Sequence, residues 1–234
     1  IYDQAIGKTE QKTKIIQHGG GINGFSTYAL RLPEKKVFVA VLSNTESGGN
    51  APQMVAAKVA AIAIGKPFPD HKAVTVAPEV LEKYVGVYTI DDKNTRTIRF
   101  EDGKLTMQRT GRERLPLTAY KEDGFFFQDS LATLEFVRDA KGDVTGIAMT
   151  NDGGDRLIQS RTADKPLERT AVTIAAATFD SYLGRYQLAP GFLIEVRRDG
   201  EKMIAQGTGQ PAIEILPLSD TAFFSKGGDA EFHI

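Results

Sequence analysis

Residues 73–88 read AVTVAPEVLEKYVGVY, and residues 171–186 read AVTIAAATFDSYLGRY. The two stretches align at an offset of 98 positions. The same offset aligns Thr110-Gly111 with Thr208-Gly209, and Phe125-Phe126 with Phe223-Phe224. A collinear series of matches at one spacing is typical of an internal duplication. The sequence therefore predicts two copies of one structural module.

Each copy has the pattern of short β-strands. Apolar and polar residues alternate around Asp102-Gly103 in the first copy and around Asp199-Gly200 in the second. An Asp-Gly pair between alternating segments is a strong hairpin signal. Further strands are expected at residues 124–128, 133–138, 144–150 and 156–160. Strands of this number and length predict a small antiparallel barrel, preceded by a short helical turn at 78–84 or 176–182.

The second copy is expected to be incomplete. Glu231-Phe232 aligns with Glu135-Phe136, and the sequence stops at Ile234, whereas the first copy extends to about Arg161. We therefore expect a first module at residues 71–165 and a truncated second module at 166–234. An open barrel exposes unpaired strand edges, so we expect further chain or a partner to cover them.

The composition of the 234 residues is that of a soluble globular protein, with 41% hydrophobic and 25% charged side chains. The 29 basic and 30 acidic side chains give a net charge of −1, which does not favour nucleic acid or a membrane as partner. Cysteine is absent, which excludes disulfides and a thiol nucleophile. His18, His71 and His233 have no metal-ligand spacing, so we expect no metal and no cofactor.

Residues 1–70 lie outside the repeat. A strand at 14–17 runs into His18-Gly19-Gly20-Gly21, and two more strands are expected at 25–32 and 37–42, on either side of a turn. A helix is expected from Ala51 to Ile64, with apolar residues at helical spacing and Gly65 as its C-cap. The expected order is strand, strand, strand, helix.

The segment His18-Gly19-Gly20-Gly21-Ile22-Asn23-Gly24-Phe25-Ser26 resembles the third active-site motif of class C β-lactamases, D-aminopeptidases and related esterases. The hairpin and helix after it resemble the end of that catalytic domain, and the Tyr-x-Gly-x-Tyr repeats resemble the lipocalin-like domains that follow it. The resemblance implies a mainly β fold with some α: a C-terminal hairpin and helix of a β-lactamase-like domain at 1–70, then two lipocalin-like barrels, the second incomplete.

The resemblance also implies roles for three residues. His18 and Gly20 belong to the motif, where His18 helps to place the substrate or its developing charge. The backbone N–H of Gly21 points at the scissile carbonyl oxygen, and such donors are each worth about 10²–10³ in rate. A glycine suits a strand that a substrate approaches closely.

The nucleophile motif of that superfamily is Ser-x-x-Lys, and no serine of this sequence has lysine three residues later. The second motif, Tyr-x-Asn or Ser-x-Asn, is absent too. We therefore expect the chain to be a fragment, inactive alone, of a parent serine hydrolase acting on a small molecule or peptide. The resemblance implies a periplasmic or secreted parent.

An alternative from a different class remains open. The barrels would form a ligand-binding or oligomerisation module, and the glycine-rich motif would be an inert turn. Tyr84, Tyr88, Tyr182 and Tyr186 would then line a cavity; otherwise they anchor the entry helix to the barrel. The expected partners are the missing catalytic part, another chain or a second copy.

Overall fold

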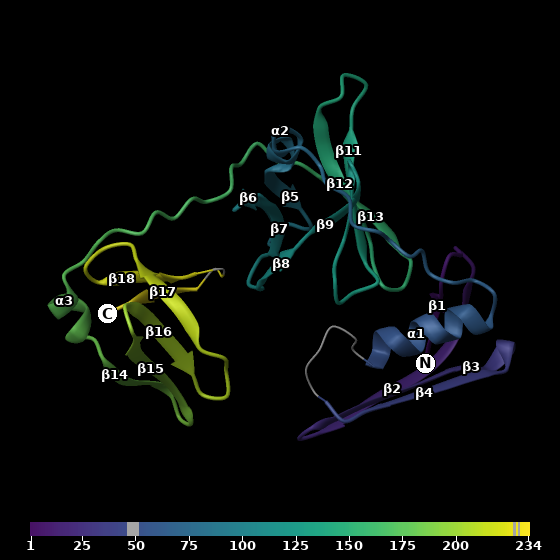
Figure 1. The fold of residues 1–234 in the computed structure, drawn as a ribbon, viewed down its shortest axis with the longest axis horizontal. Helices are drawn as coiled ribbons and strands as arrows, with labels where there is room; N and C mark the ends of the chain where they lie inside the picture. Colours follow the sequence, from purple (N-terminus) through teal and green to yellow (C-terminus); the bar gives the residue numbers. More distant parts are fainter. Residues whose placement is uncertain (46–51, 227, 229) are drawn as a thin grey trace. The chain divides into compact units, whose positions relative to one another are not determined.

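The computed structural model describes residues 1–45, 52–226, 228 and 230–234. The fold is mainly β, and its strands pair antiparallel (Figure 1). The chain forms two compact units: a larger one of Ile1–Met107 and Leu115–Asp164, and a smaller one of Gln108–Arg114 and Lys165–Ile234. The division into domains at 1–70, 71–165 and 166–234 stays a prediction. Among the described helices, none is long and apolar enough to cross a membrane.

The larger unit begins with a four-stranded sheet in the order β1-β2-β3-β4. Its strands are β1 (Tyr2–Ala5), β2 (Lys12–Ile22), β3 (Phe25–Leu32) and β4 (Val37–Ser43). The 3-10 turn η1 (Pro33–Lys35) joins β3 to β4 and ends in Lys36, whose φ of 53° is left-handed. Strand β2 is longer than predicted: His18 to Gly21 lie within the strand rather than after it.

Helix α1 (Pro52–Ala63) packs against β3 and β4. The predicted start of this helix, Ala51, lies outside the described residues. Three small side chains, Ala56, Ala60 and Ala61, are fully buried and allow the helix to approach the sheet closely. The chain turns out of the helix at Gly65, whose φ of +70° is the left-handed conformation expected of a C-cap.

Two sheets enclose the main core of the larger unit. We call these two sheets, together with the short helix that leads into them, the two-sheet module. One sheet has the order β5-β6-β7-β8, and the other has the order β13-β12-β11-β10-β9. The elements are α2 (Pro78–Leu81), η2 (Glu82–Tyr84), β5 (Gly86–Thr89), β6 (Thr95–Glu101), β7 (Lys104–Arg109), β8 (Arg114–Pro116), β9 (Thr118–Lys121), β10 (Gly124–Phe126), β11 (Thr133–Arg138), β12 (Val144–Thr150) and β13 (Arg156–Ser160).

Aromatic and aliphatic side chains from both sheets fill this core. Tyr84, Tyr88, Phe125, Leu134 and Ile147 are each at most 1% exposed. An isolated bridge between Tyr88 and Arg161 connects the sheets at one edge. Closure into a lipocalin-like barrel stays a prediction, whereas the antiparallel, mainly β character is confirmed.

The smaller unit contains one six-stranded sheet in the order β14-β15-β16-β17-β18-β19. Its elements are α3 (Ala176–Asp180), β14 (Gly184–Ala189), β15 (Phe192–Asp199), β16 (Lys202–Gly207), β17 (Ile213–Pro217), β18 (Ala222–Ser225) and β19 (Glu231–His233). Phe179 and Phe223 are fully buried at the centre of its core.

Positions separated by 98 residues make the same contacts in the two units. The hydroxyl of Tyr88 donates to the carbonyl of Tyr84 at 2.7 Å, and that of Tyr186 donates to the carbonyl of Tyr182 at 2.7 Å. The strand registers agree as well, because Gly86 pairs with Ile98 and Gly184 pairs with Val196.

Candidate functional site

The predicted motif occupies the second half of β2. His18 pairs with Ala29 of β3, Gly20 with Thr27 and Gly21 with Ser26. All three motif residues are exposed, whereas Thr13 and Ile15 in the first half of the strand are buried. The structure thus brings His18, Gly20 and Gly21 together along one exposed strand segment.

The glycines of this segment are not required by the backbone. Gly19, Gly20 and Gly21 have no positive φ, so a residue with a side chain can adopt their conformations. Among the described residues, a Cβ at Gly21 would approach only the Phe25 carbonyl, at 3.4 Å. Glycine within a strand weakens it, and it often marks a place where another backbone approaches closely.

One edge of β2 is hydrogen-bonded to β1 over the first part of the strand only. Strand β1, which alone among the described strands pairs with this edge, reaches only from Lys12 to Ile15. Further along, the Thr27 hydroxyl donates to the Gly20 carbonyl at 3.2 Å, which places that carbonyl on the β3 side. Successive residues of a strand direct their backbone groups to opposite edges. The Gly21 N–H therefore points to the edge that β1 leaves uncovered.

The face of the sheet opposite α1 carries several exposed apolar side chains. Side chains on one face alternate with those on the other, so His18 shares its face with Ala29 and Ala40. The same face carries Leu42, 82% exposed, and Phe38, 67% exposed. His18 therefore lies at the border of an exposed apolar surface, which we call the open sheet face.

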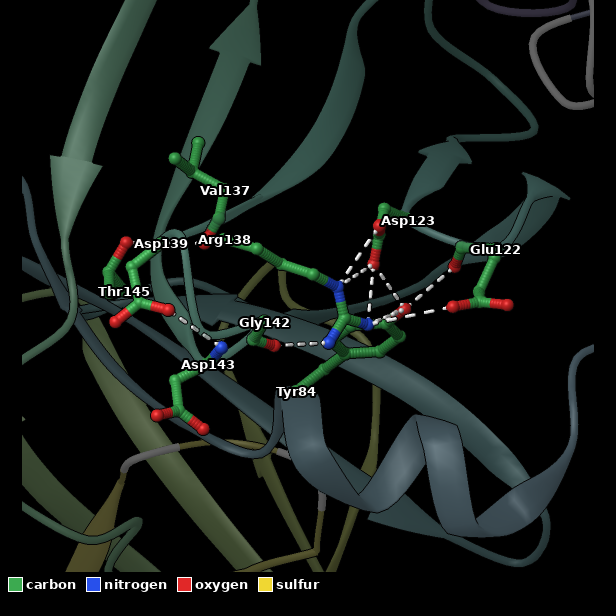
Figure 2. Close-up of polar contacts among 9 residues, drawn as sticks. All are labelled: Tyr84, Glu122, Asp123, Val137, Arg138, Asp139, Gly142, Asp143 and Thr145. Carbon is green, nitrogen blue, oxygen red and sulfur yellow. Dashed lines mark hydrogen bonds and ion pairs between the residues drawn. The ribbon is translucent and has the colours of Figure 1, made fainter.

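A polar cluster that sequence reasoning missed lies in the two-sheet module (Figure 2). The Tyr84 hydroxyl donates to Asp123 Oδ1 at 2.6 Å, and Arg138 Nε donates to the same oxygen at 2.9 Å. The Arg138 guanidinium also donates to the Gly142 carbonyl at 2.9 Å. The three side chains are 39 and 15 residues apart in sequence, so no local motif signals them.

The charges of this cluster are mutually compensated. Burial raises the pKa of Asp123, but hydrogen bonds from Arg138 and Tyr84 outweigh it, so that the carboxyl pKa lies below its usual range. Burial, together with Asp123, raises the pKa of the Tyr84 phenol. The chain between β9 and β10 is held against β11 by three groups: the ionised carboxylate of Asp123, the neutral phenol of Tyr84 and the paired guanidinium of Arg138. The cluster is structural in character.

The other two histidines, His71 and His233, each contact residues near them in their own unit. The ring of His71 packs at a tilt against that of Tyr120, with a centroid distance of 3.9 Å, and burial lowers the pKa of its imidazole. His233 belongs to the smaller unit, where its Nε2 lies 3.7 Å from Glu231. Among the described residues, no three His, Cys, Asp or Glu side chains are grouped as a metal site would require.

These observations define the class of fold. It is antiparallel and mainly β, and it has an exposed glycine-rich strand. Residues 70–163 match the model of a domain of unknown function, DUF3471. Penicillin-binding protein 4* of Bacillus subtilis (strain 168) is 26% identical over 132 residues, which cover 54% of this chain and 29% of that protein. These two matches support a relationship to the β-lactamase-like proteins.

Two solved structures are also similar. "Crystal structure of SurE with D-Leu" is 18% identical and covers 68% of this chain and 37% of that chain, with a TM-score of 0.33. "Crystal structure of SurE" is 21% identical and covers 62% and 34%, also with a TM-score of 0.33. This chain therefore spans less than a third of the curated relative and little more than a third of these solved chains.

Proposed function

We propose that this chain is the C-terminal part of a β-lactamase-like serine hydrolase and that β2 provides its third active-site motif. The observation that carries the proposal is the edge of β2 beyond Ile15, which β1 leaves uncovered and where three glycines stand that the backbone does not require. The relationship to a penicillin-binding protein supports the same class of enzyme. Its substrate is an ester, an amide or a D-amino-acid peptide.

In this proposal the substrate lies along the uncovered edge of β2. The Gly21 N–H donates to the carbonyl oxygen as negative charge develops there, a term worth about 10²–10³ in rate. The exposed imidazole of His18 helps to place the substrate. The nucleophile belongs to a Ser-x-x-Lys segment that is not in this sequence, so the 234 residues alone are inactive.

The two repeated modules shape the catalytic cleft or mediate assembly in this proposal. Their common origin is supported by the equal hydrogen bonds of Tyr88 and Tyr186 and by the equal registers of β5-β6 and β14-β15. We propose that each is a lipocalin-like barrel, and that the one in the smaller unit is incomplete.

The experiment uses the full-length gene product and follows the hydrolysis of a chromogenic ester and a D-aminopeptide. Gly21→Val should lower kcat/KM at least 100-fold, because its side chain blocks the approach of the substrate. The thermal midpoint should change little, since among the described residues a Cβ at this position meets only the Phe25 carbonyl, at 3.4 Å. Lys14→Val is the matched control, because it lies on the same strand where β1 already covers the edge.

His18→Ala is the second variant, and it should reduce turnover while leaving the fold intact, because this side chain is exposed. Wild-type rates in both Gly21→Val and His18→Ala would show that the motif is only part of a hairpin. A full-length sequence without Ser-x-x-Lys, or substantial turnover by the 234 residues alone, would also contradict the proposal.

A further inference from the structure

A cavity of about 620 Å³ lies within the larger unit. It is lined by the two-sheet module and by the N-terminal segment, which comprises β1 to β4 and α1. Its lining includes the apolar side chains of Ile6, Ile15, Leu30, Met54, Met149 and Leu157. Small-molecule sites are typically concave, mostly apolar and of 300–1,000 Å³. His18, Gly20 and Gly21 do not line this cavity, so it is not explained by the proposed function.

One polar atom in the lining, Oε1 of Gln159, has no hydrogen-bond partner among the described residues. Gln159 of β13 pairs with Ile147 of β12, and cross-strand neighbours direct their side chains to the same face, here the inner one. Gln159 is 5% exposed, and no donor among the described residues reaches its Oε1. A buried amide oxygen of this kind favours a ligand with an N–H or O–H group, because an unmet acceptor costs stability.

The charges around the cavity favour a cation. Four carboxylates line it, and one guanidinium, that of Arg96; the carboxylates belong to Asp3, Asp129, Asp152 and Asp155. Asp155 is partly neutralised by Lys12, whose Nζ lies at 2.9 Å from Oδ1. The remaining carboxylates still outnumber the guanidinium, and a concave site with an excess of one sign concentrates ligands of the opposite sign.

We propose that this cavity binds a small apolar molecule that carries a protonated amine. The apolar body of the ligand packs against Met149 and Leu157, and its ammonium group donates to Oε1 of Gln159 within the acidic surroundings. The site belongs to the two-sheet module and the N-terminal segment. It does not depend on the hydrolase assignment or on a nucleophile elsewhere.

The test titrates the whole 234-residue chain with 3-methylbutylamine and follows backbone amide shifts by NMR. The amine should bind with a dissociation constant on the order of 1 mM or below, and shift the amides of Leu157 and Gln159. Two probes of the same carbon skeleton, 3-methylbutanol and 3-methylbutanoate, should bind at least 10-fold more weakly. Equal binding of all three, or a preference for the carboxylate, would overturn the proposal.

Gln159→Leu tests the residue itself. This variant should weaken amine binding about 10-fold or more, as expected for the loss of a hydrogen bond to a charged group. It should at the same time raise the thermal midpoint, because it removes a buried amide oxygen that has no donor among the described residues. Gln108→Leu is the matched control: Gln108 is 2% exposed and lies outside the cavity lining, so its loss should leave amine binding unchanged. Unaltered amine binding in Gln159→Leu would overturn the assignment.

Discussion

At the residue scale, the burial of Tyr88 makes the stability of the protein depend on pH. Its side chain is fully buried, and its hydroxyl donates to the Tyr84 carbonyl at 2.7 Å. Burial raises the pKa of the Tyr88 phenol to about 12, against about 10 in an unfolded chain. The folded state thus favours the neutral phenol, and this contribution to stability is complete below pH 10. It is lost as the pH rises from about 10 to about 12.

We predict that the free energy of unfolding of the wild-type protein falls between pH 10 and pH 12. Tyr88→Phe should be less stable at neutral pH by about 1 kcal/mol, because a hydrogen bond is lost. Its alkaline decrease should be shallower than that of the wild type. Urea unfolding at a series of pH values measures both effects. Tyr2→Phe, at an exposed position, should follow the wild-type profile; identical slopes for Tyr88→Phe and the wild type would refute the prediction.

At the element scale, Arg161 joins the two sheets of the two-sheet module. Its guanidinium donates to the carbonyls of Val85 and Val144, and the backbone N–H of the next residue, Thr162, donates to the Val87 carbonyl at 2.8 Å. The bonds to Val85 and Val87 connect the end of β13 to the β5 region, although β13 and β5 belong to different sheets, whereas the bond to Val144 stays within the β13 sheet.

We predict that Arg161→Met lowers the free energy of unfolding by about 1–3 kcal/mol, because carbonyl groups at the junction lose their donors. Hydrogen exchange at the Thr162 amide should become faster than in the wild type. Arg156→Met is the control on the same strand, since its ion pair with Glu135, at 3.3 Å, is largely exposed and should be worth less than about 1 kcal/mol. Equal losses in the two variants would mean that Arg161 does not join the sheets.

At the scale of the whole molecule, the open sheet face exposes apolar side chains that a further surface could cover. It carries exposed Ile22, Phe25, Phe38 and Leu42 on the side of the sheet opposite α1. Several exposed apolar side chains on one face are a feature of places where protein packs against protein. In the proposed parent, the rest of the catalytic domain or a partner chain covers it.

We predict that the 234-residue chain alone self-associates through this face. Sedimentation velocity should show a weight-average mass that rises with concentration. The double variant Phe38→Ser, Leu42→Ser should shift the chain toward the monomer, because it removes the two largest exposed side chains of β4. Leu188→Ser, at a position 66% exposed in the smaller unit, should associate as the wild type does. A monomeric wild-type chain at all concentrations would contradict this prediction.

The sequence by itself determined the features that depend on neighbouring residues. Alternation and turn residues predicted β11, β12 and β13 with the bounds that the structure has. The Asp102-Gly103 hairpin is confirmed too, since both residues have the positive φ that its turn requires. The glycine-rich motif could likewise be recognised in the sequence as an unusual segment, although its role in catalysis stays a prediction.

Only the tertiary structure decided which strands pair across long separations and which faces are buried. Strand β1 was not predicted, yet its end opposite Ile15 creates the uncovered edge of β2. Helix α1 was predicted from the spacing of its apolar residues, yet the large side chains of Val59 and Ile62 are exposed, whereas three alanines are buried against the sheet. Gln159 likewise reads as an ordinary strand residue until β12 fixes its side chain on the inner face. Local patterns fix turns and periodicity, but pairing and burial depend on contacts between residues far apart in the chain.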